Sequence, residues 1–183
     1  MTTIIGIGNP EEQYYKTRHN IGFLLLDFTA KNYATDFELD KKTNSYTAKA
    51  EIKGEKVQFI KPLLYVNKTG DILKKIKVSP AKLIVVQDDL DIPFGKVKLS
   101  FDKDSAGHKG VESVIRVIKT KKFYRLRIGL ANSALKRARN QRTIEKKSEE
   151  VGKFVLSKFT PSEQKEMPQI FKKAIEILEQ HLS

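Results

Sequence analysis

The chain carries two kinds of hydrophobic pattern, one typical of strands and one typical of helices. Two short uninterrupted apolar runs, Thr2–Ile7 and Leu83–Gln87, predict strands that are buried on both faces. Regular alternation of polar and apolar residues predicts four more strands, at Tyr46–Ile52, Lys56–Lys61, Lys96–Phe101 and Tyr124–Leu130. Helical spacing of apolar residues predicts helices at Asn20–Ala34, Leu64–Ile76, Gly107–Thr120 and from the N-cap Thr160 to Leu182.

Strands and helices therefore alternate along the chain, which predicts an α/β fold. We expect a single domain over residues 1–183, with a mixed, twisted central sheet flanked by helices on both faces. One segment does not follow this alternation, because residues 131–150 are polar and basic and have no clear apolar face. We expect this segment to be a long basic loop within the domain, either functional or mobile.

The positive charge of the chain is concentrated in one region. The sequence has 35 Lys and Arg against 22 Asp and Glu, a formal net charge of +13. Residues 116–147 hold twelve of the basic side chains and a single acid, Glu145. A basic stripe with balanced charge elsewhere favours binding to the phosphate backbone of a nucleic acid. The alternative is a solvated, lysine-rich surface without a partner.

Composition excludes several classes of protein. There is no cysteine, so neither a disulfide framework nor a thiolate zinc site can form. No apolar run approaches the roughly 18 residues that a membrane span needs, and no signal peptide is recognisable. We therefore expect a globular, cytoplasmic protein that does not bind membranes.

Candidate chemistry lies directly after two predicted strands. Asn9 follows the first strand, and the run Asp88-Asp89-Leu90-Asp91 follows the strand at Leu83–Gln87. If the two strands are neighbours, these side chains face one crevice at the carboxyl edge of the sheet. The acidic run also fits a turn in which Asp side chains cap the backbone, or a Mg²⁺ site of two or three carboxylates.

Two histidines and a glycine-rich turn complete the candidates. His19 directly precedes a predicted helix and His108 lies at the start of another, whereas His181 lies in the last helix and has no evident role. Gly6-Ile7-Gly8 invites a dinucleotide-binding interpretation, but Glu11 occupies the third glycine position and would repel a pyrophosphate. A tight turn after the strand is the simpler interpretation.

Ordered motifs over nearly the whole chain resemble the bacterial peptidyl-tRNA hydrolase family. They are Gly8-Asn9-Pro10, Tyr14-x-x-Thr17-Arg18-His19-Asn20-x-Gly22, Lys61-Pro62, Tyr65-Val66-Asn67-x-x-Gly70, Asp88-Asp89-Leu90-Asp91-x-Pro93-x-Gly95, Gly107-His108-x-Gly110, Tyr124-Arg125-Leu126-Arg127-Ile128-Gly129 and Phe154-Val155-Leu156-Ser157-x-Phe159. Each motif alone is weak, but their order and spacing together are specific. The resemblance implies hydrolysis of the ester between a peptide and the terminal ribose of tRNA, which frees the tRNA for reuse in translation.

The resemblance also implies roles for individual residues. His19 matches the general base, and an imidazole with a pKa near 6.5 can take a proton at neutral pH. Asp88 matches the acid that orients this ring. Substrate-binding positions are matched by Asn9, Tyr14, Tyr65, Asn67, His108 and Lys109. Arg127 matches the residue that meets the 5′-phosphate of tRNA. The implied partner is peptidyl-tRNA alone, and we expect a monomer with no metal, no cofactor and no required protein partner.

Four positions depart from the family pattern. Glu11 stands where the family usually has Gly, and Lys109 stands where it has an active-site Asn. Ser100 replaces the lysine that partners Arg127, and Lys98 or Lys103 can substitute for it. The segment 131–150 is longer and more basic than usual, and we expect three of its arginines to grip tRNA: Arg137, Arg139 and Arg142.

Two other functions stay open on the sequence. A non-catalytic RNA-binding protein on the same scaffold would explain the basic stripe and Lys109. A Mg²⁺-dependent phosphodiesterase would use Asp88, Asp89 and Asp91. Turnover of an N-blocked aminoacyl-tRNA separates the first alternative from an esterase, and sensitivity to EDTA separates the second.

Overall fold

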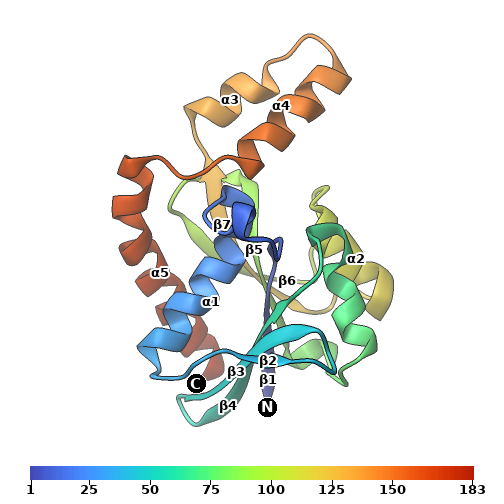
Figure 1. The fold of residues 1–183 in the computed structure, drawn as a ribbon, viewed down its shortest axis with the longest axis vertical. Coiled ribbons are helices and arrows are strands. Elements are labelled where there is room, and N and C mark those ends of the chain that lie inside the picture. The colour runs from blue at the N-terminus through green and yellow to red at the C-terminus, as the bar shows by residue number, and fades with distance from the viewer.

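A computed structural model describes residues 1–183 and contains one seven-stranded sheet in the order β2-β3-β4-β1-β5-β7-β6 (Figure 1). The strands are β1 (Thr2–Gly6), β2 (Glu38–Asp40), β3 (Ser45–Ile52), β4 (Glu55–Pro62), β5 (Leu83–Pro93), β6 (Val97–Phe101) and β7 (Tyr124–Ala131). β1 pairs in parallel with both β4 and β5, and β5 pairs in parallel with β7. The other pairings are antiparallel, so the sheet is mixed, as predicted.

Helices cover both faces of the sheet. The α-helices are α1 (Ile21–Asn32), α2 (Lys109–Ile118), α3 (Ser133–Arg139), α4 (Ile144–Leu156) and α5 (Pro161–Leu182). Short 3₁₀ helices are η1 (Glu12–Tyr14), η2 (Arg18–Asn20), η3 (Val66–Lys74) and η4 (Pro80–Lys82). α1 and α5 lie on one face, and α2 and η3 on the other (Figure 1). None of the helices is long and apolar enough to cross a bilayer.

Alternation within the central strands builds a separate core on each face. Ile4 and Val86 belong to the larger cluster, which packs against α1 and α5. Ile5 and Val85, their neighbours in the chain, belong to the smaller cluster against α2 and η3. Successive side chains of a strand point to opposite faces, so an uninterrupted apolar run is what a sheet covered on both sides requires. The predicted α/β fold is therefore confirmed.

Glycine permits a close contact between η3 and α2. A Cβ added to Gly70 of η3 would lie 2.1 Å from the backbone oxygen of Ser113 in α2. The backbone N–H of Gly70 also donates to the Ser113 hydroxyl at 3.0 Å. This approach holds η3 against α2 and fixes the segment that carries Tyr65 and Asn67.

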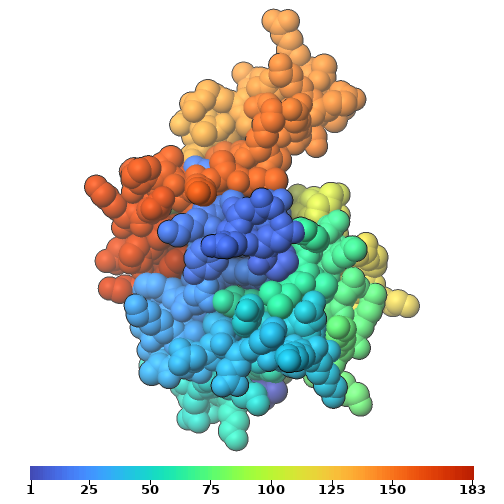
Figure 2. Space-filling model, viewed as in Figure 1, coloured from blue at the N-terminus to red at the C-terminus, as the bar shows by residue number.

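The prediction of a loop over residues 131–150 is wrong. The structure forms the hairpin of α3 and α4 there, which projects from the body as an arm (Figures 1 and 2). Capping starts both helices, because Asn132 accepts from the N–H of Leu135 and Thr143 accepts from that of Lys146. The arm buries few apolar side chains, Leu135 and Ala138 in α3 and Phe154 in α4, which is why its periodicity is weak.

Other boundaries also differ from the prediction. The predicted helix at Leu64–Ile76 is the 3₁₀ helix η3, and the short edge strand β2 was not predicted. β5 continues beyond Gln87 to Pro93, because Asp88 and Asp89 pair with Ile128 and Gly129 of β7. The last helix begins as predicted, with a capping box between Thr160 and Glu163.

Candidate active site

The sheet order places the predicted site residues at one edge. β1 and β5 are neighbouring parallel strands, so Asn9 after β1 and Asp88 in β5 lie at the same carboxyl edge. His19 comes from η2, the turn that leads into α1. His108 is the N-cap of α2. Residues far apart in the sequence therefore converge where open α/β sheets form their ligand sites.

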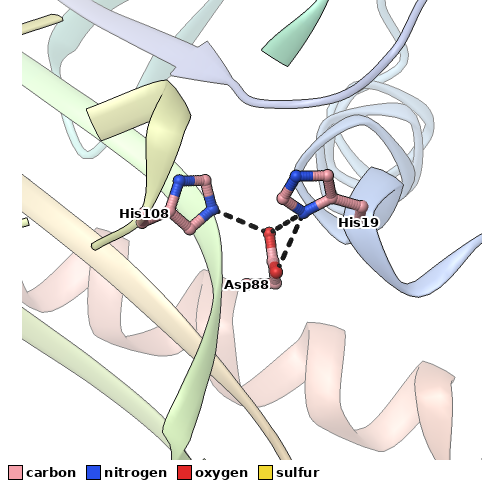
Figure 3. Close-up of side chains that lie close together, drawn as sticks. All are labelled: His19, Asp88 and His108. Carbon is pink, nitrogen blue, oxygen red and sulfur yellow. Dashed lines mark hydrogen bonds and ion pairs between the residues drawn. The ribbon is translucent and has the colours of Figure 1, made fainter. Parts of the chain in front are cut away.

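One buried carboxylate joins the two histidines. Nδ1 of His19 lies 2.9 Å and 3.0 Å from the two oxygens of Asp88 (Figure 3). Nε2 of His108 lies 2.9 Å from Oδ1 of the same carboxylate. The side chain of Asp88 is 2% exposed, so these rings take the place of water around its charge. The arrangement is a His-Asp-His cluster in which each ring donates an N–H to Asp88.

The hydrogen bonds define what His19 can do. A carboxylate only accepts, so Nδ1 of His19 carries the hydrogen that it donates to Asp88. In the neutral ring the lone pair is then on Nε2, which points away from Asp88 (Figure 3). Such a nitrogen can take a proton from water, and Asp88 can stabilise the imidazolium that results.

Burial and charge act in opposite directions on the pKa values of this cluster. Burial lowers the pKa of His19, but the charge of Asp88 and its hydrogen bond outweigh burial and hold that pKa above its ordinary value. Burial raises the pKa of Asp88, whereas the two histidines lower it by more, so this carboxyl stays ionised far below neutral pH. Asp88 is therefore an ionised counter-ion to His19 at neutral pH.

The same three residues form the only cluster of His, Asp and Glu side chains that is close enough to hold a metal ion. Each offers one ligand atom, and these three atoms lie within 4.8 Å of one another. The nitrogens that face Asp88 hold the hydrogens of its hydrogen bonds, so a metal would have to displace them. Asp88, Asp89 and Asp91 do not converge as a Mg²⁺ site would require. Asp89 is paired with Arg127 at 2.7 Å and Asp91 with Arg139 at 2.9 Å.

Two clefts meet at His19. The first, of about 290 Å³ and here named the α4 cleft, lies between α4 and the loop before α2. Its α4 wall consists of Ser148, Val151, Gly152 and Val155. The second, here named the amide cleft, is lined by Asn9, His19, Tyr65, Val66, Asn67, Lys68 and Lys109. His19 and Lys109 line both clefts.

The amide cleft contains most of the predicted substrate-binding residues. The side-chain oxygen of Asn9 accepts from the N–H of Val66 at 3.1 Å, which leaves the Asn9 amide NH₂ as its group for a ligand. Asn67 and Tyr65 are exposed at the rim, where the Tyr65 hydroxyl donates to Glu11. Tyr14 lines neither cleft. Its carbonyl instead accepts from Thr17 in the turn before His19.

The predicted phosphate-binding residues lie in two places. Arg127 of β7 donates to Asp89 and, at 3.2 Å, to the hydroxyl of Ser100, and Lys98 is its partner across the sheet. Lys103 is exposed in the loop after β6. Arg137, Arg139 and Arg142 lie on the arm, and Arg139 also lines the α4 cleft. One set therefore lies on the sheet and its following loop, and the other on the arm.

Sequence reasoning missed the anchor behind His19. Arg18 is 4% exposed and pairs with Glu163 at 2.7 Å. It also donates at 2.6 Å to the Ser157 hydroxyl and to the carbonyl of Lys158. Its guanidinium lies 4.6 Å from the ring centre of Phe154. Arg18 thus ties the turn with His19 to the junction of α4 and α5, a contact that the Arg18-His19 motif does not reveal.

Comparison with known proteins gives a consistent result. Residues 3–183 match the family model described as peptidyl-tRNA hydrolase. The peptidyl-tRNA hydrolase of Aquifex aeolicus is 40% identical over 179 residues, which is 96% of this chain and 86% of the relative. That of Mycobacterium tuberculosis is 33% identical and covers 96% of this chain and 88% of its own.

Solved structures agree with the sequence comparison. The crystal structure of peptidyl-tRNA hydrolase from Acinetobacter baumannii superposes with a TM-score of 0.81 at 27% identity, over 96% of this chain and 85% of the other. A peptidyl-tRNA hydrolase in complex with N-propanol gives a TM-score of 0.83 at 27% identity, over 98% and 87% of the two chains.

Proposed function

The chain belongs to the peptidyl-tRNA hydrolase family, and from that premise we propose that His19 and Asp88 carry out the hydrolysis of peptidyl-tRNA. The observation that carries this proposal is the hydrogen bond between Nδ1 of His19 and the buried carboxylate of Asp88. It leaves Nε2 of His19 as a base at the junction of the two clefts.

The reaction follows from the positions of these atoms. Nε2 of His19 takes a proton from water, and the water oxygen bonds to the carbonyl carbon of the ester. The tetrahedral intermediate collapses, the bond to the ribose oxygen breaks, and the imidazolium returns the proton to that oxygen. The products are a peptide with a free carboxylate and a tRNA with a free hydroxyl. Asp88 stays ionised throughout and stabilises the imidazolium.

The amide cleft suits the peptide. The NH₂ of Asn9 and the exposed amide of Asn67 can donate to carbonyl oxygens, including the oxyanion that develops during attack. One donor aimed at that oxyanion is worth about 3–4 kcal/mol of barrier. Lys109 can donate in the same way but cannot accept, so it does not reproduce every role of the Asn that the family has there.

The α4 cleft and the basic arm suit the tRNA. The arm carries Arg137, Arg139 and Arg142 next to the cleft that reaches His19. Arg127, with Lys98 opposite and Ser100 as a hydroxyl donor, provides a second anion-binding surface on the sheet, and Lys103 lies beyond it. Phosphate contacts of this kind supply affinity and position without reading sequence.

The substrate and the site also bear on location and assembly. Peptidyl-tRNA arises in translation, which supports a cytoplasmic location. The histidines, the carboxylate and both clefts all come from one chain, so a monomer is sufficient. No step of the proposed reaction requires a metal or a cofactor.

The test is hydrolysis of an N-acetylated aminoacyl-tRNA in excess EDTA. His19→Ala is expected to lower kcat by about 10²–10⁴, the typical contribution of a general base, while tRNA affinity stays near that of the wild type. His181→Ala is the matched control, because His181 of α5 packs against the ring of Tyr124 in β7 and lines neither cleft. Full activity of His19→Ala would exclude the mechanism. Activity that EDTA abolishes and Mg²⁺ restores would favour a phosphodiesterase, and tight binding without turnover would favour a non-catalytic RNA-binding protein.

A further inference from the structure

His108 has two hydrogen bonds that together fix the position of its hydrogen. Nδ1 accepts from the backbone N–H of Gly110 at 3.1 Å, as the N-cap of α2. A backbone N–H can only donate, so this nitrogen presents a lone pair. The ring hydrogen is therefore on Nε2, which donates it to Oδ1 of Asp88 at 2.9 Å.

The second donor changes what Asp88 offers to His19. Oδ1 of Asp88 accepts from both rings, and the carboxylate is buried away from water. Each N–H that a carboxylate accepts stabilises its charge and lowers its affinity for a further proton donor. His108 therefore competes with His19 for the same oxygen.

We propose that His108 is a positioning residue that limits how strongly Asp88 holds the proton of His19, so that His19 remains a free base near neutral pH. The helix cap of α2 is part of this device, because it keeps the lone pair on Nδ1 and the hydrogen on Nε2. The consequence for catalysis rests on the proposed role of His19 as general base. The hydrogen-bond geometry does not depend on that role.

No other charged group around His19 competes with Asp88. The α4 wall of the cleft has no charged side chain. Arg18 is paired with Glu163, Asp89 with Arg127, Asp91 with Arg139 and Lys109 with Glu112. Lys68, also in the amide cleft, has no ion-pair partner, but it is exposed and, as a cation, does not compete with Asp88 for the proton of His19. The ionisation of His19 is thus governed by burial, by Asp88 and, through Asp88, by His108.

The substitution His108→Asn separates the two roles of this residue. Asparagine is among the best N-cap residues, and its amide oxygen can accept from Gly110 as Nδ1 does. Its side chain is too short to reach Asp88. His108→Ala removes both contacts. If His108 acted only as a helix cap, His108→Asn would behave like the wild type, and only His108→Ala would be less stable.

NMR titration of the histidine ring protons measures the effect directly. The chain has three histidines, so His108→Asn leaves only the signals of His19 and of His181, which is a distant internal reference. Without the N–H of His108, His19 is the only histidine that donates to Asp88, and the carboxylate stabilises the protonated form of His19 more strongly. The titration midpoint of His19 should therefore move to higher pH, while that of His181 stays unchanged. The acid limb of kcat/KM should move in the same direction. His108→Ala should shift His19 as far, with lower stability in addition.

A His19 midpoint that stays fixed in His108→Asn, or moves to lower pH, would overturn the proposal. The titration requires only folded protein, so this outcome is distinguishable from failure of the proposed hydrolase mechanism. That mechanism fails if His19→Ala retains activity, whatever the titration gives.

Discussion

Replacing Asp88 by Asn tests the core of the site with a nearly isosteric change. Both histidine rings direct an N–H at the Asp88 carboxylate, at 2.9–3.0 Å. An amide offers one oxygen and one NH₂ where the carboxylate offers two oxygens. If the amide oxygen takes the Oδ1 position, its NH₂ lies about 3.0 Å from Nδ1 of His19, donor against donor. If it takes the Oδ2 position, the NH₂ faces both rings.

Either arrangement favours the His19 tautomer with its hydrogen on Nε2, because Gly110 already fixes the tautomer of His108. A neutral ring in that tautomer cannot take a proton from water at the cleft. In the Ser-His-Asp triad of serine proteases, replacing the orienting carboxylate by an amide costs about 10⁴ in kcat. We expect a loss of about 10³–10⁴ here, which is about 4–5 kcal/mol of barrier.

The assay is kcat for an N-acetylated aminoacyl-tRNA at saturation, with thermal unfolding measured in parallel. Asp89→Asn is the matched control, because Asp89 is also buried in β5 but pairs with Arg127 instead of His19. It should keep kcat within about tenfold of the wild type. An Asp88→Asn enzyme within tenfold of the wild type would refute the reasoning. Equal losses in both variants that follow the loss of folded protein would assign Asp88 a structural role.

Three further predictions follow from the same contacts. kcat/KM of the wild type should rise with pH around a midpoint above 6.5, because Asp88 raises the pKa of His19 despite burial and the base must be unprotonated; a midpoint below 6.5 contradicts this. Replacing Arg137, Arg139 and Arg142 together by Ala should weaken tRNA binding and leave kcat unchanged. The slope of log K against log salt should become shallower by about 0.9 per lost phosphate contact, and an unaltered slope would show that the arm does not contact the tRNA phosphates. Arg18→Met leaves Glu163 buried without its cation and should cost about 3–5 kcal/mol in urea unfolding, and a cost near zero would exclude the anchor.

The sequence predicted the elements whose periodicity is strong and missed those held by a few contacts. β1 and the start of β5 are continuous apolar runs because both faces of the sheet are covered. α3 and α4 bury only three apolar side chains between them, so their spacing carries little signal. Their caps, Asn132 and Thr143, were the visible evidence for helices in the basic segment.

The site was predictable as a set of residues but not as a network. Motifs identified His19, Asp88 and His108, and neighbouring parallel strands explained why Asn9 and Asp88 meet. That His108 shares Oδ1 of Asp88 depends on how the loop after β6 returns to the sheet. The pairs Arg18–Glu163 and Asp89–Arg127 join positions 145 and 38 residues apart, which no local pattern encodes.

The central claim is that water activated by His19 attacks the ester carbonyl carbon of peptidyl-tRNA. The most direct test is a single turnover of wild-type enzyme in water enriched in ¹⁸O, with EDTA present and the products analysed by mass spectrometry. The mechanism predicts one ¹⁸O in the carboxylate of the released peptide and none in the tRNA. An ¹⁸O in a phosphate of the tRNA, or a peptide released without the label, would contradict it.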